Sequence, residues 1–198
     1  MRVMTHFLLW SLGLREAETQ TTDAERECLT RHASGKKRLV EIGVWHGVTT
    51  CCLRSAMAPD GFLLGVDPFP VGRLGFSAQR YIARREVTRI QSGSMRWARL
   101  TGVEAAHGYA SSGGKSVDFV FIDGDHTVEG LRDDWQAWSP LVTQGGIVAL
   151  HDSCSSQTRQ IDDAGSTVFT REVILQDPRF ELVETVDTLT VLRRRSGE

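Results

Sequence analysis

Short apolar segments alternate with stretches of helical periodicity along the chain, and this alternation constrains the fold more than any other sequence feature. Such an order is typical of βαβ units, in which crossover helices join parallel strands. Five apolar segments are predicted as strands: Arg38–Gly43, Phe62–Asp67, Val87–Gln91, Val117–Asp123 and Gly146–His151. Helices are predicted at 47–57, 72–85, 94–100 and 127–138. The order predicts an α/β fold built on a parallel sheet.

The last part of the sequence departs from this order. A helix predicted at 167–176 is followed by two apolar segments, Phe180–Val186 and Leu189–Arg193, with only Asp187 and Thr188 between them. Two short strands joined so closely form an antiparallel hairpin. The predicted fold is therefore a three-layer α/β sandwich with a mostly parallel seven-stranded sheet that ends in this hairpin. A dinucleotide-binding domain would normally end in another parallel strand.

Length and composition restrict the class of protein. The 198 residues fit one domain, 1–198, in which 1–34 form a helical N-terminal segment. A net charge of −2 gives no electrostatic reason to expect a nucleic-acid partner. Four cysteines without a C-x-x-C pair indicate reduced thiols and a cytoplasmic location. The apolar run 7–14 is too short to cross a membrane and is predicted to be an amphipathic helix, which packs on the domain or on a second copy in a homodimer.

The first predicted strand runs into a glycine-containing turn, VEIGVWHG. Gly43 and Gly47 allow the backbone to turn sharply and a ligand to come close, and the helix that follows presents free N–H groups. Glu41, near the end of the strand, is placed to reach the amino or carboxylate end of an amino-acid ligand. The dinucleotide fingerprint G-x-G-x-x-G is absent, so a pyrophosphate is not the expected ligand.

Two further elements suit the nucleoside part of a ligand. Asp67 ends the second predicted strand, where a carboxylate can accept both ribose hydroxyls. Ser92, Gly93 and Ser94 follow the third predicted strand and are expected to contact adenine, although such a loop can also serve only as a helix cap. Together the three elements predict S-adenosylmethionine, a nucleoside cofactor without phosphates.

Acidic and histidine residues follow the fourth and fifth predicted strands. Asp123, Asp125 and His126 come after one strand, and His151 with Asp152 after the next. Neighbouring parallel strands deliver such residues to the carboxyl edge of a sheet, where open α/β sheets bind their ligands. Partly buried carboxylates are costly unless a cation or another partner compensates them.

These segments resemble a known family. The pattern FIDGDH…EG…D…W…L…GGIVALHDS, together with VEIGVWHG, is similar to class I S-adenosylmethionine-dependent methyltransferases of the family that contains macrolide-sugar O-methyltransferases and cephalosporin-hydroxylase-like proteins. It is more distantly similar to catechol O-methyltransferase. The likeness spans roughly residues 38–153 and implies a Rossmann-like methyltransferase fold with S-adenosylmethionine as the cofactor.

The resemblance also implies roles for particular residues. In metal-dependent relatives the corresponding positions, here Asp123, His151 and Asp152, hold a divalent cation such as Mg²⁺ or Mn²⁺, and Asp123 also lies beside the cofactor. His126 matches the general-base histidine of the macrolide-sugar enzymes. The chain departs from the pattern at His151, where relatives carry Asp or Glu, and imidazole is a poorer ligand for magnesium than for zinc, manganese or iron. His151 and Asp152 could instead only shape the pocket, and His126 could be a cofactor contact.

The sequence therefore predicts a metal-assisted O-methyltransferase that acts on a hydroxyl of a sugar or another polyhydroxylated small molecule. Two alternatives remain open at this point. One is a catechol-type phenol O-methyltransferase, and the other is a catalytically silent cofactor-binding partner subunit. A nicotinamide-dependent oxidoreductase is disfavoured because the glycine-rich pyrophosphate loop is missing.

Overall fold

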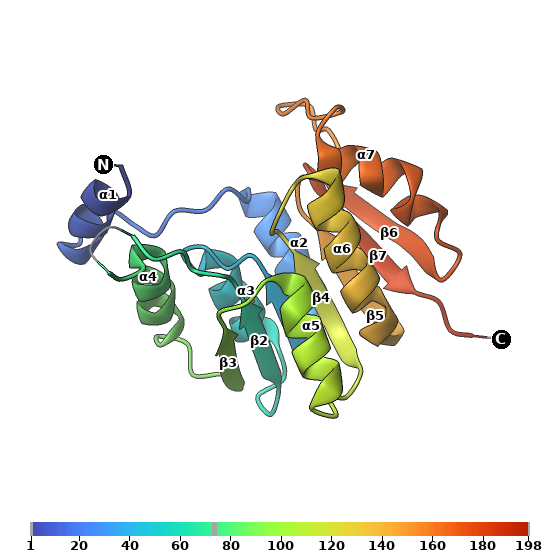
Figure 1. Ribbon diagram of the computed structural model, residues 1–198, viewed down its shortest axis with the longest axis horizontal. Coiled ribbons are helices and arrows are strands. Elements are labelled where there is room, and N and C mark those ends of the chain that lie inside the picture. Colours follow the sequence, from blue (N-terminus) through green and yellow to red (C-terminus); the bar gives the residue numbers. More distant parts are fainter. Residues whose placement is uncertain (1, 73–74, 198) are drawn as a thin grey trace.

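A computed structural model describes residues 2–72 and 75–197 and contains a seven-stranded sheet in the order β3-β2-β1-β4-β5-β7-β6 (Figure 1). Strands β1 to β5 are parallel, and β7 runs antiparallel to both of its neighbours. The strands are β1 (Arg38–Ile42), β2 (Phe62–Val66), β3 (Ser94–Ala98), β4 (Val117–Ile122), β5 (Val142–Leu150), β6 (Phe180–Val186) and β7 (Leu189–Arg194). The predicted mostly parallel sheet with a C-terminal antiparallel hairpin is confirmed.

Helices cover both faces of this sheet and make the two outer layers of the sandwich (Figure 1). One face carries α5 (Gly102–Ser111), α6 (Val128–Trp138) and α7 (Gly165–Glu172). The other carries α2 (Asp23–Ala33) and α3 (Val48–Ala56). Helix α4 (Ala78–Val87) packs on α3, and α1 (Arg2–Ser11) packs on α4. Two short 3-10 turns, Ser139–Leu141 and Ile174–Gln176, follow α6 and α7.

The alternation of side chains along the central strands builds two cores. Val40 of β1 and Val120 of β4 are paired in register and join the core under α5, α6 and α7. The preceding pair, Leu39 and Phe119, points to the opposite face and joins the core under α2 and α3. Because both faces are covered, most residues of these two strands are apolar and buried.

The third strand lies where the sequence did not predict it. Residues 87–91 were predicted as a strand and 94–100 as a helix, but α4 continues to Val87 and β3 is Ser94–Ala98. The side chain of Ser77 caps α4, whose buried face runs through Ile82 to Val87. Val87, the β-branched residue that resembled the start of a strand, lies on this buried face and belongs to the helix. The predicted helix at 72–85 begins later, at Ala78, and residues 73–74 lie outside the described residues.

This shift moves Ser92, Gly93 and Ser94 to the amino end of β3 instead of its carboxyl end. The Ser94 amide donates to the carbonyl of Gly61, which lies just before β2. A Cβ on Gly93 would lie 2.1 Å from Cε of Met57 and 2.7 Å from the Gly61 carbonyl oxygen. The loop therefore makes a tight turn at the edge of the sheet where the parallel strands begin. The prediction that this loop follows a strand is wrong, and its contact with adenine stays a prediction.

The N-terminal helix packs on the body of the protein through aromatic rings. Phe7 and Tyr81 meet edge to face, with ring centroids 5.5 Å apart, and the Trp10 indole donates to Glu86 at 2.7 Å. Several neighbouring apolar side chains remain exposed: Val3, Leu8, Leu12 and Leu14.

Among the described residues, no helix is both long and apolar enough to cross a membrane. The single-domain assignment of 1–198, with its 1–34 segment, stays a prediction.

A close backbone approach at Gly43 joins the two central strands. Gly43 has a φ of 88°, and a Cβ there would lie 1.9 Å from the carbonyl oxygen of Asp123. The Asp123 amide in turn donates to the carbonyl of Ile42 at 2.8 Å. Only glycine fits this position, because any side chain would collide with backbone that cannot move without displacing β4.

Replacing Gly43 with Ala should therefore destabilise the protein by about 3 kcal/mol or more, through steric overlap added to left-handed backbone strain. The matched control is Gly113→Ala, at a φ of 74° with nothing within 4 Å of the added Cβ. That substitution should cost only about 1–2 kcal/mol. Urea unfolding of the two variants measures the difference, and equal losses would contradict the steric explanation.

Candidate active site

A cavity of about 760 Å³ opens at the carboxyl edge of the sheet. Its walls come from the loops after β1, β2, β3 and β4, from the first turns of α3, α5 and α6, and from residues 18–20 of the N-terminal segment. Among the residues predicted for the site, Gly43, Asp67, Asp123 and His126 line it. The structure therefore brings together the loop after the first strand, the acid after the second, and Asp123 and His126 after the fourth.

Asp67 is held rigidly at the end of β2. Its Oδ2 accepts backbone N–H groups of Val44 at 3.1 Å and Trp45 at 2.9 Å, and its Oδ1 accepts the amide of Phe69 at 2.7 Å. One carboxylate thus fixes the turn after β1 to the turn after β2. It also faces the cavity, so its remaining acceptor capacity is available to hydroxyl groups of a bound ligand.

Glu41 and Gly47 lie behind the cavity wall and do not line it. Glu41 is fully buried, its Oε1 accepts the hydroxyl of Thr49, and its Oε2 has no hydrogen bond within the described residues. Burial raises the pKa of Glu41 to about 8. Gly47 caps α3 with a left-handed φ of 78°. Both residues support the loop after β1 from the protein interior, and the contact of Glu41 with the cofactor stays a prediction.

The wall that the sequence assigned to Ser92–Ser94 is formed by residues 100–103, at the carboxyl end of β3. Thr101 caps α5 in a capping box with Glu104. The T-x-x-E spacing is a recognisable helix-start signal, and reading it would have placed the end of the preceding strand correctly. Trp45, Gly102 and Asp134 also line the cavity and were not predicted as site residues.

Asp123 lies between two histidines. Its Oδ1 is 3.5 Å from Nε2 of His126 and 2.9 Å from Nδ1 of His151. The His126 side chain is 38% exposed and reaches the cavity, whereas that of His151 is 1% exposed and does not line it. The two histidines of the predicted motifs therefore differ in position: one can meet a ligand, and the other supports Asp123 from inside.

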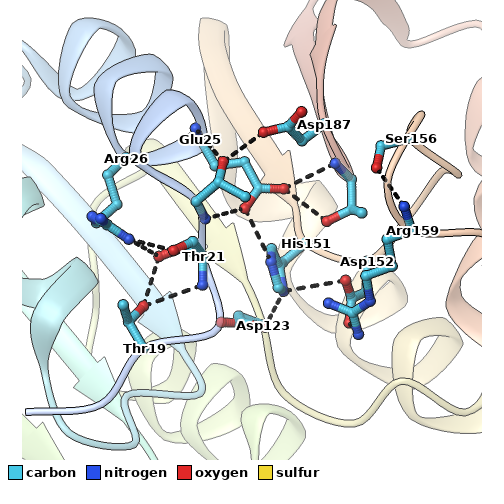
Figure 2. A network of polar contacts seen from close by, with 12 residues as sticks. Thr19, Thr21, Glu25, Arg26, Asp123, His151, Asp152, Ser156, Arg159 and Asp187 are labelled. Atoms are coloured by element: carbon cyan, nitrogen blue, oxygen red, sulfur yellow. Dashed lines mark hydrogen bonds and ion pairs between the residues drawn. The ribbon is translucent and has the colours of Figure 1, made fainter.

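A buried glutamate from the N-terminal segment completes this arrangement (Figure 2). Oε2 of Glu25 in α2 lies 3.4 Å from Nε2 of His151 and accepts the Thr22 amide, while Oε1 accepts the amide and hydroxyl of Thr188. Glu25 was not predicted because its local sequence only marks a capping box at the start of α2. Its link to the site depends entirely on tertiary packing.

The imidazole of His151 thus has a carboxylate beside each ring nitrogen. Burial alone would lower its pKa, but Asp123 and Glu25 raise the pKa to about 10, which makes the ring an imidazolium at neutral pH. Burial alone would raise the pKa of Glu25, but His151, Thr22 and Thr188 lower it to about 2. The three residues form a buried chain of alternating charge. Their side chains lie at ion-pair distances, but neither ring nitrogen of His151 makes an aligned hydrogen bond.

Asp152, the third predicted metal ligand, is engaged elsewhere. Its Oδ2 lies 2.6 Å from a guanidinium nitrogen of Arg159, and its Oδ1 is 3.8 Å from Nδ1 of His151 (Figure 2). The residues whose ligand atoms all lie within 4.8 Å of one another are instead Asp123, His126 and His151. One carboxylate and two imidazoles do not suit magnesium, which prefers oxygen ligands. The predicted set Asp123, His151 and Asp152 therefore does not fit a magnesium ion.

The buried charge chain should make stability depend on pH. The pKa of His151 is higher in the folded protein, so its contribution is complete below the unfolded value of about 6.5 and is lost as the pH rises through about 10. The pKa of Glu25 is lower in the folded protein, so its contribution is present above about 4.5 and is lost as the pH falls through about 2.

The difference in Tm between the wild type and His151→Gln should thus be largest between about pH 4.5 and 6.5 and should shrink on both sides. His107→Gln is the matched control, because His107 is exposed on α5, outside the site. Thermal unfolding monitored by circular dichroism over this range measures both. A His151→Gln difference that stays constant between about pH 6 and pH 10 would contradict the buried imidazolium.

Comparison with known proteins agrees with this geometry. A sequence family described as a methyltransferase domain matches residues 40–153. A Mycobacterium avium protein, whose name provisionally assigns it to the O-methyltransferases, is 30% identical over 141 residues, which cover 68% of this chain and 56% of that protein. The chain therefore spans about half the length of the curated relatives it matches.

Solved structures show the same fold at low sequence identity. An O-methyltransferase from Bacillus cereus in complex with SAH superposes with a TM-score of 0.66 at 15% identity, covering 98% of this chain and 91% of that one. The O-methyltransferase TomG from Streptomyces achromogenes, in complex with SAM, gives 0.68 at 14% identity, covering 98% and 88%. The chain belongs to the methyltransferase-domain family, and its fold is that of the class I S-adenosylmethionine-dependent methyltransferases.

Proposed function

We propose that the protein transfers a methyl group from S-adenosylmethionine to a hydroxyl oxygen of a small molecule, with His126 as the general base. One observation carries this proposal: a partly exposed imidazole lines the cavity at the end of β4, beside a carboxylate that can orient it. A hydroxyl acceptor needs such a base because it is a weak acid, whereas the sulfonium is already a good leaving group.

The charge of the cavity wall supports a cationic cofactor. Six carboxylates line the cavity, and among the described lining residues His126 is the one basic side chain: Glu18, Asp67, Asp123, Asp125, Asp133 and Asp134 are the acids. Such a wall attracts a sulfonium and an ammonium group and repels phosphates and acidic acceptors. It favours a neutral acceptor, such as a sugar or another polyhydroxylated molecule. Since Trp45 is the one aromatic residue in the described wall, a flat catechol is less well accommodated.

The transfer would proceed by in-line displacement. The acceptor hydroxyl oxygen attacks the methyl carbon, the carbon–sulfur bond breaks, and its electron pair stays on sulfur to give a neutral thioether. The hydroxyl proton passes to the free ring nitrogen of His126, and Asp123 stabilises the resulting imidazolium from the other side. His151 and Glu25 hold Asp123 in place and do not touch the reacting atoms.

Metal assistance, which the resemblance implies, forms no part of this mechanism, because the donor set does not fit magnesium. Transfer of labelled methyl from S-adenosylmethionine to a panel of sugars and catechols should identify an acceptor. Turnover of that acceptor should then change by less than about twofold after treatment with EDTA and after addition of Mg²⁺ or Mn²⁺. A rise of about tenfold or more with either ion would overturn the metal-independent mechanism.

Substituting His126 with Ala should lower kcat for the acceptor so identified by about 10²- to 10⁴-fold, the usual contribution of a general base. The affinity for S-adenosylhomocysteine, measured by calorimetry, should remain close to that of the wild type, because His126 acts on the acceptor. His107→Ala, an exposed histidine on α5, is the control and should leave both quantities unchanged. An unchanged kcat in His126→Ala would remove His126 from the mechanism.

Three further expectations from the sequence join this proposal: a cytoplasmic location, a small-molecule acceptor instead of nucleic acid, and a homodimer formed through α1. The exposed apolar side chains of α1 are consistent with the last of these. A silent partner subunit is the alternative, and the His126 experiment distinguishes it, because a silent subunit would show no turnover to lose.

A further inference from the structure

One buried carboxylate in the cavity wall has no partner within the protein. Asp134 of α6 is 6% exposed, and no hydrogen bond or ion pair joins it to another residue in the described part of the chain. Burial, together with the nearby carboxylates of Asp125 and Asp133, raises its pKa to about 6. A buried polar group left without a partner costs stability, so a group that is absent from the free protein is expected to pair with it.

The surrounding backbone leaves space for this carboxylate and for a ligand beside it. A Cβ on Gly102, the first residue of α5, would lie 2.0 Å from Oδ1 of Asp134. A Cβ on Gly124, just after β4, would lie 3.4 Å from Oδ2. The carboxylate thus lies between the loop after β3 and the loop after β4, and glycines on both sides keep its oxygens accessible from the cavity.

The position of Asp134 selects which part of the cofactor can reach it. Gly43 and Asp67 mark the ends of β1 and β2, while the wall at Gly102 belongs to the end of β3, beyond β2 in the sheet order. With the ribose at Asp67, the base extends toward Gly102. Adenine has an amino group at position 6 that donates hydrogen bonds, and a carboxylate is the acceptor that suits it.

We propose that Asp134 accepts a hydrogen bond from the 6-amino group of adenine and thereby selects an adenosyl cofactor. This rests on the proposed function only in requiring that S-adenosylmethionine is the cofactor. In this proposal Asp134, from α6, takes over the recognition that the sequence assigned to Ser92–Ser94. The free N–H groups in the first turn of α5 complement it as donors to ring nitrogens.

The test compares S-adenosylhomocysteine with its inosine analogue, in which an oxo group replaces the 6-amino group. Calorimetry at about pH 8 should show that the wild type binds the adenosyl compound about 10- to 100-fold more tightly than the analogue. The reason is that the 6-oxo group of the analogue is a hydrogen-bond acceptor and would face the carboxylate of Asp134, which is also an acceptor. In Asp134→Asn the ratio should fall to about threefold or less, because a carboxamide can present either its oxygen or its NH₂ group to position 6.

Asp133→Asn is the matched control: Asp133 is adjacent, also lines the cavity and is more exposed, so its substitution should keep the wild-type ratio. A purely structural role for Asp134 would weaken both ligands equally and leave the ratio unchanged, which would overturn the proposal. Equal affinity of the wild type for both ligands would overturn it as well. If the wild type bound neither ligand, the cofactor assignment itself would fail, and the recognition of adenine with it.

Discussion

The pairing of His151 with Asp123 and Glu25 is the interaction on which the architecture of the site depends. It joins the ends of β4 and β5 to α2, and so ties the N-terminal segment to the two strands that carry the catalytic motifs. Removing one member of a buried ionic group usually costs more stability than replacing the whole group with apolar side chains, because the remaining charge has no partner. A single imidazolium therefore fixes both the position of Asp123 and the docking of α2.

The cavity combines a rigid part with a part supplied from far away in the sequence. The turns after β1 and β2 are fixed to each other by three backbone hydrogen bonds to Asp67, and Gly43 lies against the backbone of Asp123. A further part of the wall comes from residues 18–20, between α1 and α2. The Glu18 amide donates to Nδ1 of the buried His46, whose ring stacks on that of His6. The N-terminal segment is therefore part of the cavity and of the loop that follows β1.

Hydrophobic periodicity predicted most of the fold. It failed around β3, where the segment predicted as a strand and the segment predicted as a helix were both short. Strands β1, β2 and β4 and the second half of β5 are buried on both faces, and their apolar runs are unambiguous. Strand β3, at the edge of the sheet, is only partly buried and contains Arg96, so it lacks that signal. Residues adjacent to strand ends, such as Asp67 and His126, could be predicted for the site. Glu25 and Asp134 could not, because each belongs to a helix whose relation to the cavity is set only by tertiary packing.

The hydrogen bonds from Thr188 to Glu25 connect residues 163 positions apart. Contacts between distant parts of a chain require closure of a long loop, and they slow folding more than local contacts do. During synthesis Glu25 leaves the ribosome well before Thr188 and the hairpin that carries it. Until Thr188 follows, the carboxylate of Glu25 has neither of these hydrogen bonds, and α2 lacks its anchor. Assembly of the active site therefore waits for the hairpin, long after the part of the cavity wall at residues 18–20 has been made.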